Sequence, residues 1–319
     1  MRQRTFPPME RRNIMDKYSQ FICANTIEMD LDEIARNHMV PVHSKDNESS
    51  ISHLQFIETT VNSAKECFGE CSDPLIRVSH PIKGRIPEAR NKPAKDLLPS
   101  ETTLYYERMA WMVHFPHITA RIGTDELQLA VGGVKAYNLD NLYSTKDTLE
   151  NFKVFVGFKN TVCTNLCVAT SGFKADLKVN NLAYMSEQVG NLFFNFSVDQ
   201  VVDDFHQMVQ TTLDEAQFAQ LLGRVKLLNA MPKKLAKEIP DIGLSDSQLS
   251  SVAEDFYKDR SHCRNVDGNI SIWNMYNLFT GANKSSYIDT FLDRNVKVFE
   301  GASHIQHALS GGERSWYLN

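Results

Sequence analysis

The sequence predicts an α+β protein, with an antiparallel or mixed sheet in the N-terminal half and a helical C-terminal half. Between residues 72 and 180, short runs of β-branched and aromatic residues alternate with turn residues, as is typical of strands. After residue 180, apolar residues recur every three or four positions, which is the period of an amphipathic helix. The chain has 319 residues, 42% hydrophobic and 23% charged, and can therefore bury a sizeable core.

The overall charge and the lack of long apolar runs limit the partners of the protein. The net charge is −5 and the isoelectric point is about 6.1. Nucleic-acid binding would therefore require a local basic patch, because proteins that bind it over their whole surface are usually basic. No run approaches the roughly 20 apolar residues of a membrane span. We expect a cytoplasmic protein with no membrane partner, in which the six cysteines are mostly thiols.

Residues 1–50 are expected to form a disordered or loosely packed leader and linker. Residues 1–18 combine five basic residues and two prolines with few large apolar side chains. A polar run ends this region, and Ser50 is a candidate N-cap for an amphipathic helix over 51–68. That helix and the strands make a second region, 51–180. The helical region 181–319 is expected to pack with the sheet as one unit.

At least five strands are expected between residues 72 and 180. The first is 75–78. The following segment, 80–99, contains four prolines and a glycine, so we expect a long loop and neither a helix nor a central strand. A strand is expected at 104–115, ended by Pro116. Two more are expected at 127–131 and at 134–137, separated by a break at Gly132-Gly133. Within 152–177, a buried strand leads into a second strand or tight loop.

The second half of the chain predicts a series of amphipathic helices. Polar capping residues precede several of them, and a turn at 267–269 separates two of the later ones. The predicted helices cover 182–194, 198–213, 213–231, 245–257, 270–280, 287–299 and 304–309.

Five strings carry a resemblance to a known family. They are 79–89, 104–109, 131–138, 162–167 and 280–289. Together they resemble domain-of-unknown-function family 3871, uncharacterised proteins of bacterial mobile elements, over nearly everything after the leader. The Cys-Thr-Asn segment and the tryptophan-bearing helix near the C-terminus are more distantly similar to the phage/plasmid-like family 932. The resemblance implies a mobile-element setting, but it implies no catalytic residue and no cofactor.

The loop 80–95 supports the leading functional hypothesis. It contains a single acidic residue, Glu88, and a glycine that permits close approach of a ligand. Because its prolines make it stiff, its cations could hold the phosphates of DNA, RNA or a nucleotide. A solvated surface loop, whose cations pair with acidic residues elsewhere, is the alternative. The basic residues are Lys83, Arg85, Arg90, Lys92 and Lys95.

A second candidate for phosphate binding follows Gly281. Lys284 and Ser285 could present donors to an anion at the start of the next helix. The favoured alternative is structural: Gly281 would end one helix, and Ser285 or Ser286 would cap the next.

Two acidic clusters could bind a metal. Asp199, Asp203 and His206 share one face of a predicted helix, as the ligands of a metal-dependent nuclease or hydrolase could. A solvated acidic face is the favoured interpretation. The second cluster lies in a loop, and a solvated surface is again the favoured interpretation. Its residues are Asp259, His262, Cys263 and Asp267.

The cysteines form two Cys-x-x-x-Cys pairs, 67/71 and 163/167. Four thiolates could hold zinc, but apolar neighbours favour buried structural thiols, so no metal site is predicted. Cys163 as a nucleophile would need a histidine base, for which His80 and His114 are candidates.

The leading hypothesis from these observations is a non-enzymatic, mobile-element protein that binds DNA or RNA through the basic loop. A metal-dependent nuclease or hydrolase is the second hypothesis, so whether the chain is an enzyme stays open. A structural or protein-interaction module, such as a homo-oligomer, is the third hypothesis. The sequence identifies no cofactor.

Overall fold

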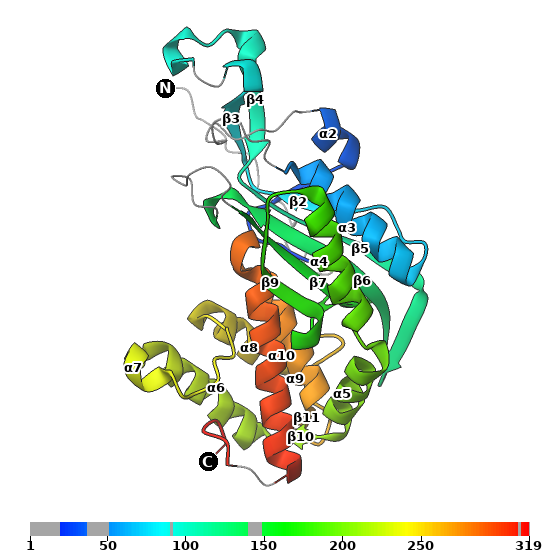
Figure 1. Ribbon diagram of the computed structural model, residues 1–319. Helices are drawn as coiled ribbons and strands as arrows, with labels where there is room; N and C mark the ends of the chain where they lie inside the picture. The colour runs from blue at the N-terminus through cyan, green and yellow to red at the C-terminus, as the bar shows by residue number, and fades with distance from the viewer. Residues whose placement is uncertain (1–19, 37–50, 90–91, 140–148, 312–313, 319) are drawn as a thin grey trace, which may run out of the picture.

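The computed structural model describes residues 20–36, 51–89, 92–139, 149–311 and 314–318, and its fold is α+β, as predicted. A curled antiparallel sheet fills most of the N-terminal half, and helices make up most of the C-terminal half (Figure 1). Among the residues described, none of the helices combines the length and the apolar character that a membrane span requires.

The main sheet has seven strands in the order β1-β2-β5-β6-β7-β8, with β9 also paired to β7. Every pair is antiparallel. The strands are β1 (Ile27–Met29), β2 (Leu75–Val78), β5 (Arg108–Ile122), β6 (Asp125–Ala136), β7 (Glu150–Asn160), β8 (Leu166–Cys167) and β9 (Phe173–Val179).

Two predicted strand breaks are wrong, because β5 and β6 continue through them. β5 passes Pro116, and its pairing with β6 shifts between Phe115 and Thr119. Proline lacks the N–H of a ladder bond, so such a bulge accommodates it. β6 runs through Gly132 and Gly133, where a turn was expected. A Cβ at Gly132 would lie 2.2 Å from a backbone oxygen of β5, so close strand packing requires this glycine.

The helical prediction holds for most segments after residue 180. One exception is the C-terminal helix, which is continuous where two helices were expected. The other is Gly281, which lies inside a helix and does not end it. The helices are α2 (Leu31–Arg36), α3 (His53–Phe68), α4 (Leu182–Asn195), α5 (Val198–Gln210), α6 (Glu215–Ala230), α7 (Lys233–Ala236), α8 (Asp246–Lys258), α9 (Ile272–Asn283) and α10 (Ile288–Gly311); β10 (Thr212–Leu213) and β11 (Ile270–Ser271) pair between them.

Helices α3 and α4 lie beside each other on one face of the sheet (Figure 1). α3 begins after Ser52, which forms a capping box with Gln55, two residues beyond the predicted cap. The Phe56 ring lies 5.6 Å from the ring of Trp111 and 4.8 Å from that of Phe152, centroid to centroid. Such aromatic contacts fix the helix over the middle of the sheet.

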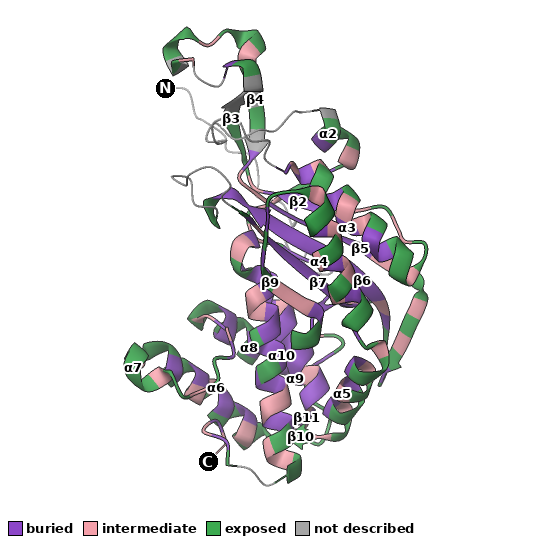
Figure 2. Cartoon of the chain, viewed as in Figure 1, coloured by how far each residue is buried: buried purple, intermediate pink, exposed green. Residues whose placement is uncertain are grey.

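The first half of α10 covers the opposite face of the sheet. Its Phe291 and Leu292 are buried in one cluster with Ala130 and Phe155. α10 also packs along α9, whose side chains are buried on nearly every side (Figure 2). α9 therefore forms the centre of the helical half, and it positions the pocket described below.

Strands β3 (Pro81–Arg85) and β4 (Thr102–Tyr106) form a separate antiparallel ribbon that projects from one end of the molecule (Figure 1). We call residues 81–106 the arm. The predicted long loop is therefore partly a strand. The ribbon is independent of the main sheet, so its prolines interrupt no central ladder. The predicted strand 104–115 is likewise divided between the arm and β5.

Part of the expected leader packs against the protein. Phe21 and Ile22 are 4% and 0% exposed in the cluster under α10, and β1 pairs with β2. Residues 1–18, for which disorder was expected, lie outside the described residues.

Candidate functional site

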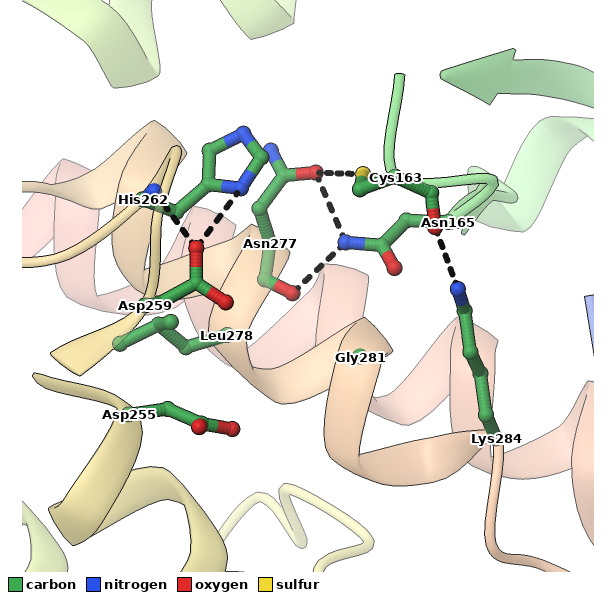
Figure 3. Close-up of a pocket in the computed structure, with 9 residues that line it drawn as sticks. All are labelled: Cys163, Asn165, Asp255, Asp259, His262, Asn277, Leu278, Gly281 and Lys284. Carbon is green, nitrogen blue, oxygen red and sulfur yellow. Dashed lines mark hydrogen bonds and ion pairs between the residues drawn. The ribbon is translucent and has the colours of Figure 1, made fainter. Parts of the chain in front are cut away.

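A pocket opens where β7 ends, at the junction with α8 and α9 (Figure 3). Its empty space is about 290 Å³, the open mouth included. Apart from Leu278 and Gly281, every lining residue carries a polar or ionisable side chain, so the pocket suits a polar group. The others are Cys163, Asn165, Asp255, Asp259, His262, Asn277 and Lys284.

The turn between β7 and β8 supplies Cys163 and Asn165. Its shape is set by Asn160, whose side-chain oxygen accepts backbone hydrogen bonds from Val162 at 2.9 Å and from Cys163 at 3.3 Å. Short amide side chains often close turns in this way, because they replace a backbone acceptor.

Thr164, in the same turn, has a φ of +55° and is the only non-glycine residue of the described chain with a positive φ. This conformation costs a β-branched residue about 1–3 kcal/mol. Two hydrogen bonds at 3.0 Å hold it: the Thr164 hydroxyl donates to the Gln20 carbonyl oxygen and accepts from the Lys284 ammonium. The strained residue thus lies between two residues that line the pocket.

An amide network joins the turn to α9. The side-chain nitrogen of Asn165 donates to the Asn277 carbonyl oxygen at 2.9 Å and to its side-chain oxygen at 3.1 Å. Since both partners are acceptors, the nitrogen of Asn165 must face α9. Its oxygen therefore turns toward the pocket (Figure 3). The two residues are 3% and 1% exposed, so the wall they form is rigid.

His262 forms another wall. Its Nε2 lies 3.0 Å from Asp125 Oδ2, which also accepts a 2.7 Å hydrogen bond from Trp273 Nε1. In the neutral ring, Nε2 therefore carries the proton and Nδ1 does not. Nδ1 is 3.8 Å from Asp259 Oδ1, too far for a hydrogen bond. Burial raises the pKa of Asp125, but the hydrogen bonds from His262 and Trp273 lower it more, so the net pKa is below its usual value.

The thiol of Cys163 is not an activated nucleophile in this geometry. Burial raises its pKa to about 11, so it is protonated at neutral pH. Its sulfur lies 4.0 Å from Asn277 Oδ1, and within the described residues no histidine nitrogen bonds to it. The histidine of its pocket is His262, and neither His80 nor His114 lines it. The thiol–imidazole pair that nucleophilic catalysis requires is not formed.

Lys284 and Ser285 lie just beyond the end of α9. Lys284 is 3% exposed, and its ammonium donates to the Cys163 carbonyl oxygen and the Thr164 hydroxyl. The Ser285 hydroxyl donates to the Ala282 carbonyl oxygen at 2.7 Å. The ammonium therefore holds the strained turn against α9 and is not available to a surface phosphate. Both residues lie at the junction of α9 and α10, in the body of the molecule, and are not part of the projecting arm (Figure 1).

The basic residues predicted to bind phosphate are spread along the arm. Lys83 and Lys95 are exposed. Lys92 donates to both carboxylate oxygens of Glu101, at 2.8 and 2.9 Å, within the arm itself. Of the remaining two, Arg85 ends β3 and Arg90 lies outside the described residues.

The candidate metal ligands are not brought together. Asp199, Asp203 and His206 are exposed on α5. Across the described ranges, no three or more His, Cys, Asp or Glu side chains are grouped to hold a metal ion. The six cysteines, all within the described ranges, form no disulfide; Cys163 and Cys167 are buried, whereas Cys67 is exposed.

Sequence reasoning named several pocket residues but did not place them together. Cys163, Asp259 and His262 were considered separately. Asn277 was missed, as was Asp125, which lies outside the pocket and orients His262. A signal was present, because two strings of the family resemblance, 162–167 and 280–289, both contribute to the pocket.

Comparison with known proteins identifies a family but no activity. A search of curated proteins and a search of solved structures found no match. A family model described as "Domain of unknown function, B. Theta Gene description (DUF3871)" matches residues 9–318, which is nearly the whole chain. The chain therefore belongs to the DUF3871 family.

Proposed function

We propose that the protein binds nucleic acid through the arm. The observation that carries the proposal is a projecting arm whose sequence holds five basic and three acidic residues, in a chain whose net charge is −5. Phosphate contacts supply most of the affinity of such proteins, and they require cations that can reach the backbone. In a mobile genetic element, the setting suggested by the sequence resemblance, DNA or RNA would be the natural polyanion.

The dimensions of the arm are compatible with a groove. Five residue pairs, from Pro81↔Tyr106 to Arg85↔Thr102, make a ribbon about 17 Å long. The major groove of B-DNA admits a two-stranded ribbon and is about 8.5 Å deep. The arm is therefore long enough to enter it, and the body of the molecule would remain outside.

Two lysines are the best candidates for the first phosphate contacts. Lys83 is exposed on β3, and Lys95 is exposed on the connection between β3 and β4. Lys92 would contribute less, because its ammonium already bonds to Glu101 and would have to exchange that partner. Arg85 lies two residues beyond Lys83 on the same strand.

Fluorescence anisotropy at low salt would test the proposal with single-stranded DNA, duplex DNA and RNA. The arm variant Lys83→Ser/Lys95→Ser is compared with Lys178→Ser/Lys258→Ser, which removes the same charge from exposed sites outside the arm. Raising the salt concentration from 50 to 200 mM should weaken wild-type binding about tenfold more than binding by the arm variant, because each phosphate contact contributes about threefold to fourfold to that salt-induced loss. Equal losses of affinity in the arm variant and in the control variant, or no binding by wild type at low salt, would contradict the proposal.

A protein partner, including a second copy of the chain, is the second candidate for the arm. Ile82, Leu98 and Leu104 are 39%, 54% and 45% exposed there, and apolar side chains of this size favour protein contacts. Light scattering would show a dimer or larger assembly that Leu98→Ser/Leu104→Ser dissociates. A monomer at all concentrations would exclude self-association, and the nucleic-acid proposal would then be tested alone.

A further inference from the structure

The pocket presents hydrogen-bond acceptors that have no donor. Asn165 Oδ1 and His262 Nδ1 belong to side chains that are 3% and 2% exposed, and neither accepts a hydrogen bond from a described residue. Asp259 Oδ1 accepts from the backbone nitrogens of Ser261 and His262, whereas its second oxygen has no donor in the described part of the chain. Three acceptors thus border one space (Figure 3).

The orientation of these groups is fixed by their other contacts. Asn165 cannot flip its amide, because its nitrogen already faces two acceptors of Asn277. Neutral His262 cannot move its proton to Nδ1 without losing the bond to Asp125. A buried acceptor without a donor costs about 1–3 kcal/mol, so the pocket is built for a group that supplies N–H donors.

The charge of the lining favours a cation. Asp255 and Asp259 lie one turn apart where α8 ends, on one side of the space. The ammonium of Lys284 lies on the far side and turns toward the Cys163 carbonyl oxygen (Figure 3). A metal ion is disfavoured because no set of three ligand side chains is grouped within the described residues.

Gly281 leaves the floor of the pocket open. A Cβ at this position would lie 3.7 Å from Asn165 Oδ1, which is an ordinary van der Waals contact. An alanine would therefore fit without distorting the fold, but it would crowd the acceptor that a ligand must reach.

We propose that this pocket binds a small organic cation with several N–H donors, a guanidinium or a primary ammonium, between the Asp259 and Asn165 side chains. The site is separate from the arm and independent of its function. The cation could be a free metabolite or the end of an arginine or lysine side chain on a polypeptide. The recognition chemistry is the same for both sources.

Isothermal titration calorimetry with methylguanidinium tests the proposal, with methylurea as the neutral probe of the same shape. We expect a dissociation constant on the order of 1 mM for so small a cation, and no heat from methylurea. Titrations with an acetylated Gly-Arg-Gly peptide and with agmatine distinguish the two sources. Tighter binding of the peptide indicates a cation carried by a polypeptide, and tighter binding of agmatine indicates a free metabolite. Either result supports the shared chemistry.

Two pocket variants and one control make the test specific. Asp259→Asn should weaken methylguanidinium binding about tenfold, because a charge-assisted bond becomes a neutral one. Gly281→Ala should weaken it while leaving thermal stability equal or higher, so misfolding cannot explain the loss. Asp267→Asn, an exposed aspartate that also accepts a backbone hydrogen bond, should bind as wild type. Equal binding of methylurea, no binding of any cation, or unchanged binding by both pocket variants would overturn the proposal.

Discussion

A buried ion pair where β6 ends and β7 begins offers a stringent test of how this fold is stabilised. The Lys135 side chain is 0% exposed, and its ammonium lies 2.9 Å from Glu150 Oε2. It also lies 4.1 Å from the ring centroid of Phe152. The other oxygen of Glu150 accepts a 2.8 Å hydrogen bond from the backbone of Ile51, next to the start of α3. The pair therefore links β6, β7 and the first helix on the sheet.

Removing one partner should cost much more than removing both. Lys135→Met retains the apolar stem but leaves the Glu150 carboxylate with one described donor, the Ile51 nitrogen. Such broken buried pairs lose about 3–5 kcal/mol. Because the Glu150 side chain is 11% exposed and keeps that donor, we expect the lower end, about 3 kcal/mol. Glu150→Gln should cost a similar amount, since it leaves a fully buried ammonium.

Urea unfolding followed by far-UV circular dichroism measures these changes. The double variant Lys135→Met/Glu150→Gln should be destabilised by only about 1–2 kcal/mol, because replacing a buried pair as a whole is often nearly neutral. Lys178→Met is the control: its 2.9 Å pair with Asp176 is more than half exposed and should contribute about 0–0.5 kcal/mol. Additive losses in the double variant, or a loss below that of the control in Lys135→Met, would refute the reasoning.

Three further predictions follow from the packing and the pocket. Gly132→Ala should lose about 1–3 kcal/mol in urea unfolding, because its Cβ would clash with backbone; Gly223→Ala, which meets nothing within 4 Å, should lose none. The folded pKa of Asp125 is lowered, so its contribution is present above its unfolded pKa of about 3.9 and is lost as pH falls through the folded value. The free energies of unfolding of wild type and Asp125→Asn should therefore become equal only below about pH 4. A thiol reagent at neutral pH should label exposed Cys67 faster than Cys163, whose buried thiol has a pKa of about 11; equal rates would contradict the buried pocket wall.

The fold class could be predicted because both halves follow simple periodicities. Most strand positions between 72 and 180 and most helices after 180 are where β-branched runs and amphipathic spacing indicated them. The errors at Pro116 and Gly132 share a cause: both residues punctuate local structure, but here a bulge accommodates Pro116 and the close approach of the partner strand requires Gly132. A single sequence does not show which strand lies beside which, so a bulge or a close approach is read as a turn.

The pocket could be predicted only in part, for a related reason. Asn165 and Asn277 are separated by 112 positions, and Asp125 and His262 by 137, so nothing local indicates that they meet. Cys163 and His262 attracted attention as residue types. Their partners are an asparagine and an aspartate, residue types that are common on any surface. The arm was recognised as a basic, proline-rich segment, but its strand pairing depends on residues 17 to 25 positions further along.

The salt dependence of nucleic-acid binding tests the central proposal most directly. The logarithm of the association constant falls with the logarithm of salt concentration by about 0.9 for each phosphate contacted on duplex DNA. Lys83→Ser/Lys95→Ser should therefore reduce the magnitude of that slope by about 1.8 relative to wild type, while Lys178→Ser/Lys258→Ser leaves it unchanged. A slope that is the same in wild type and in the arm variant would show that the arm does not contact phosphates.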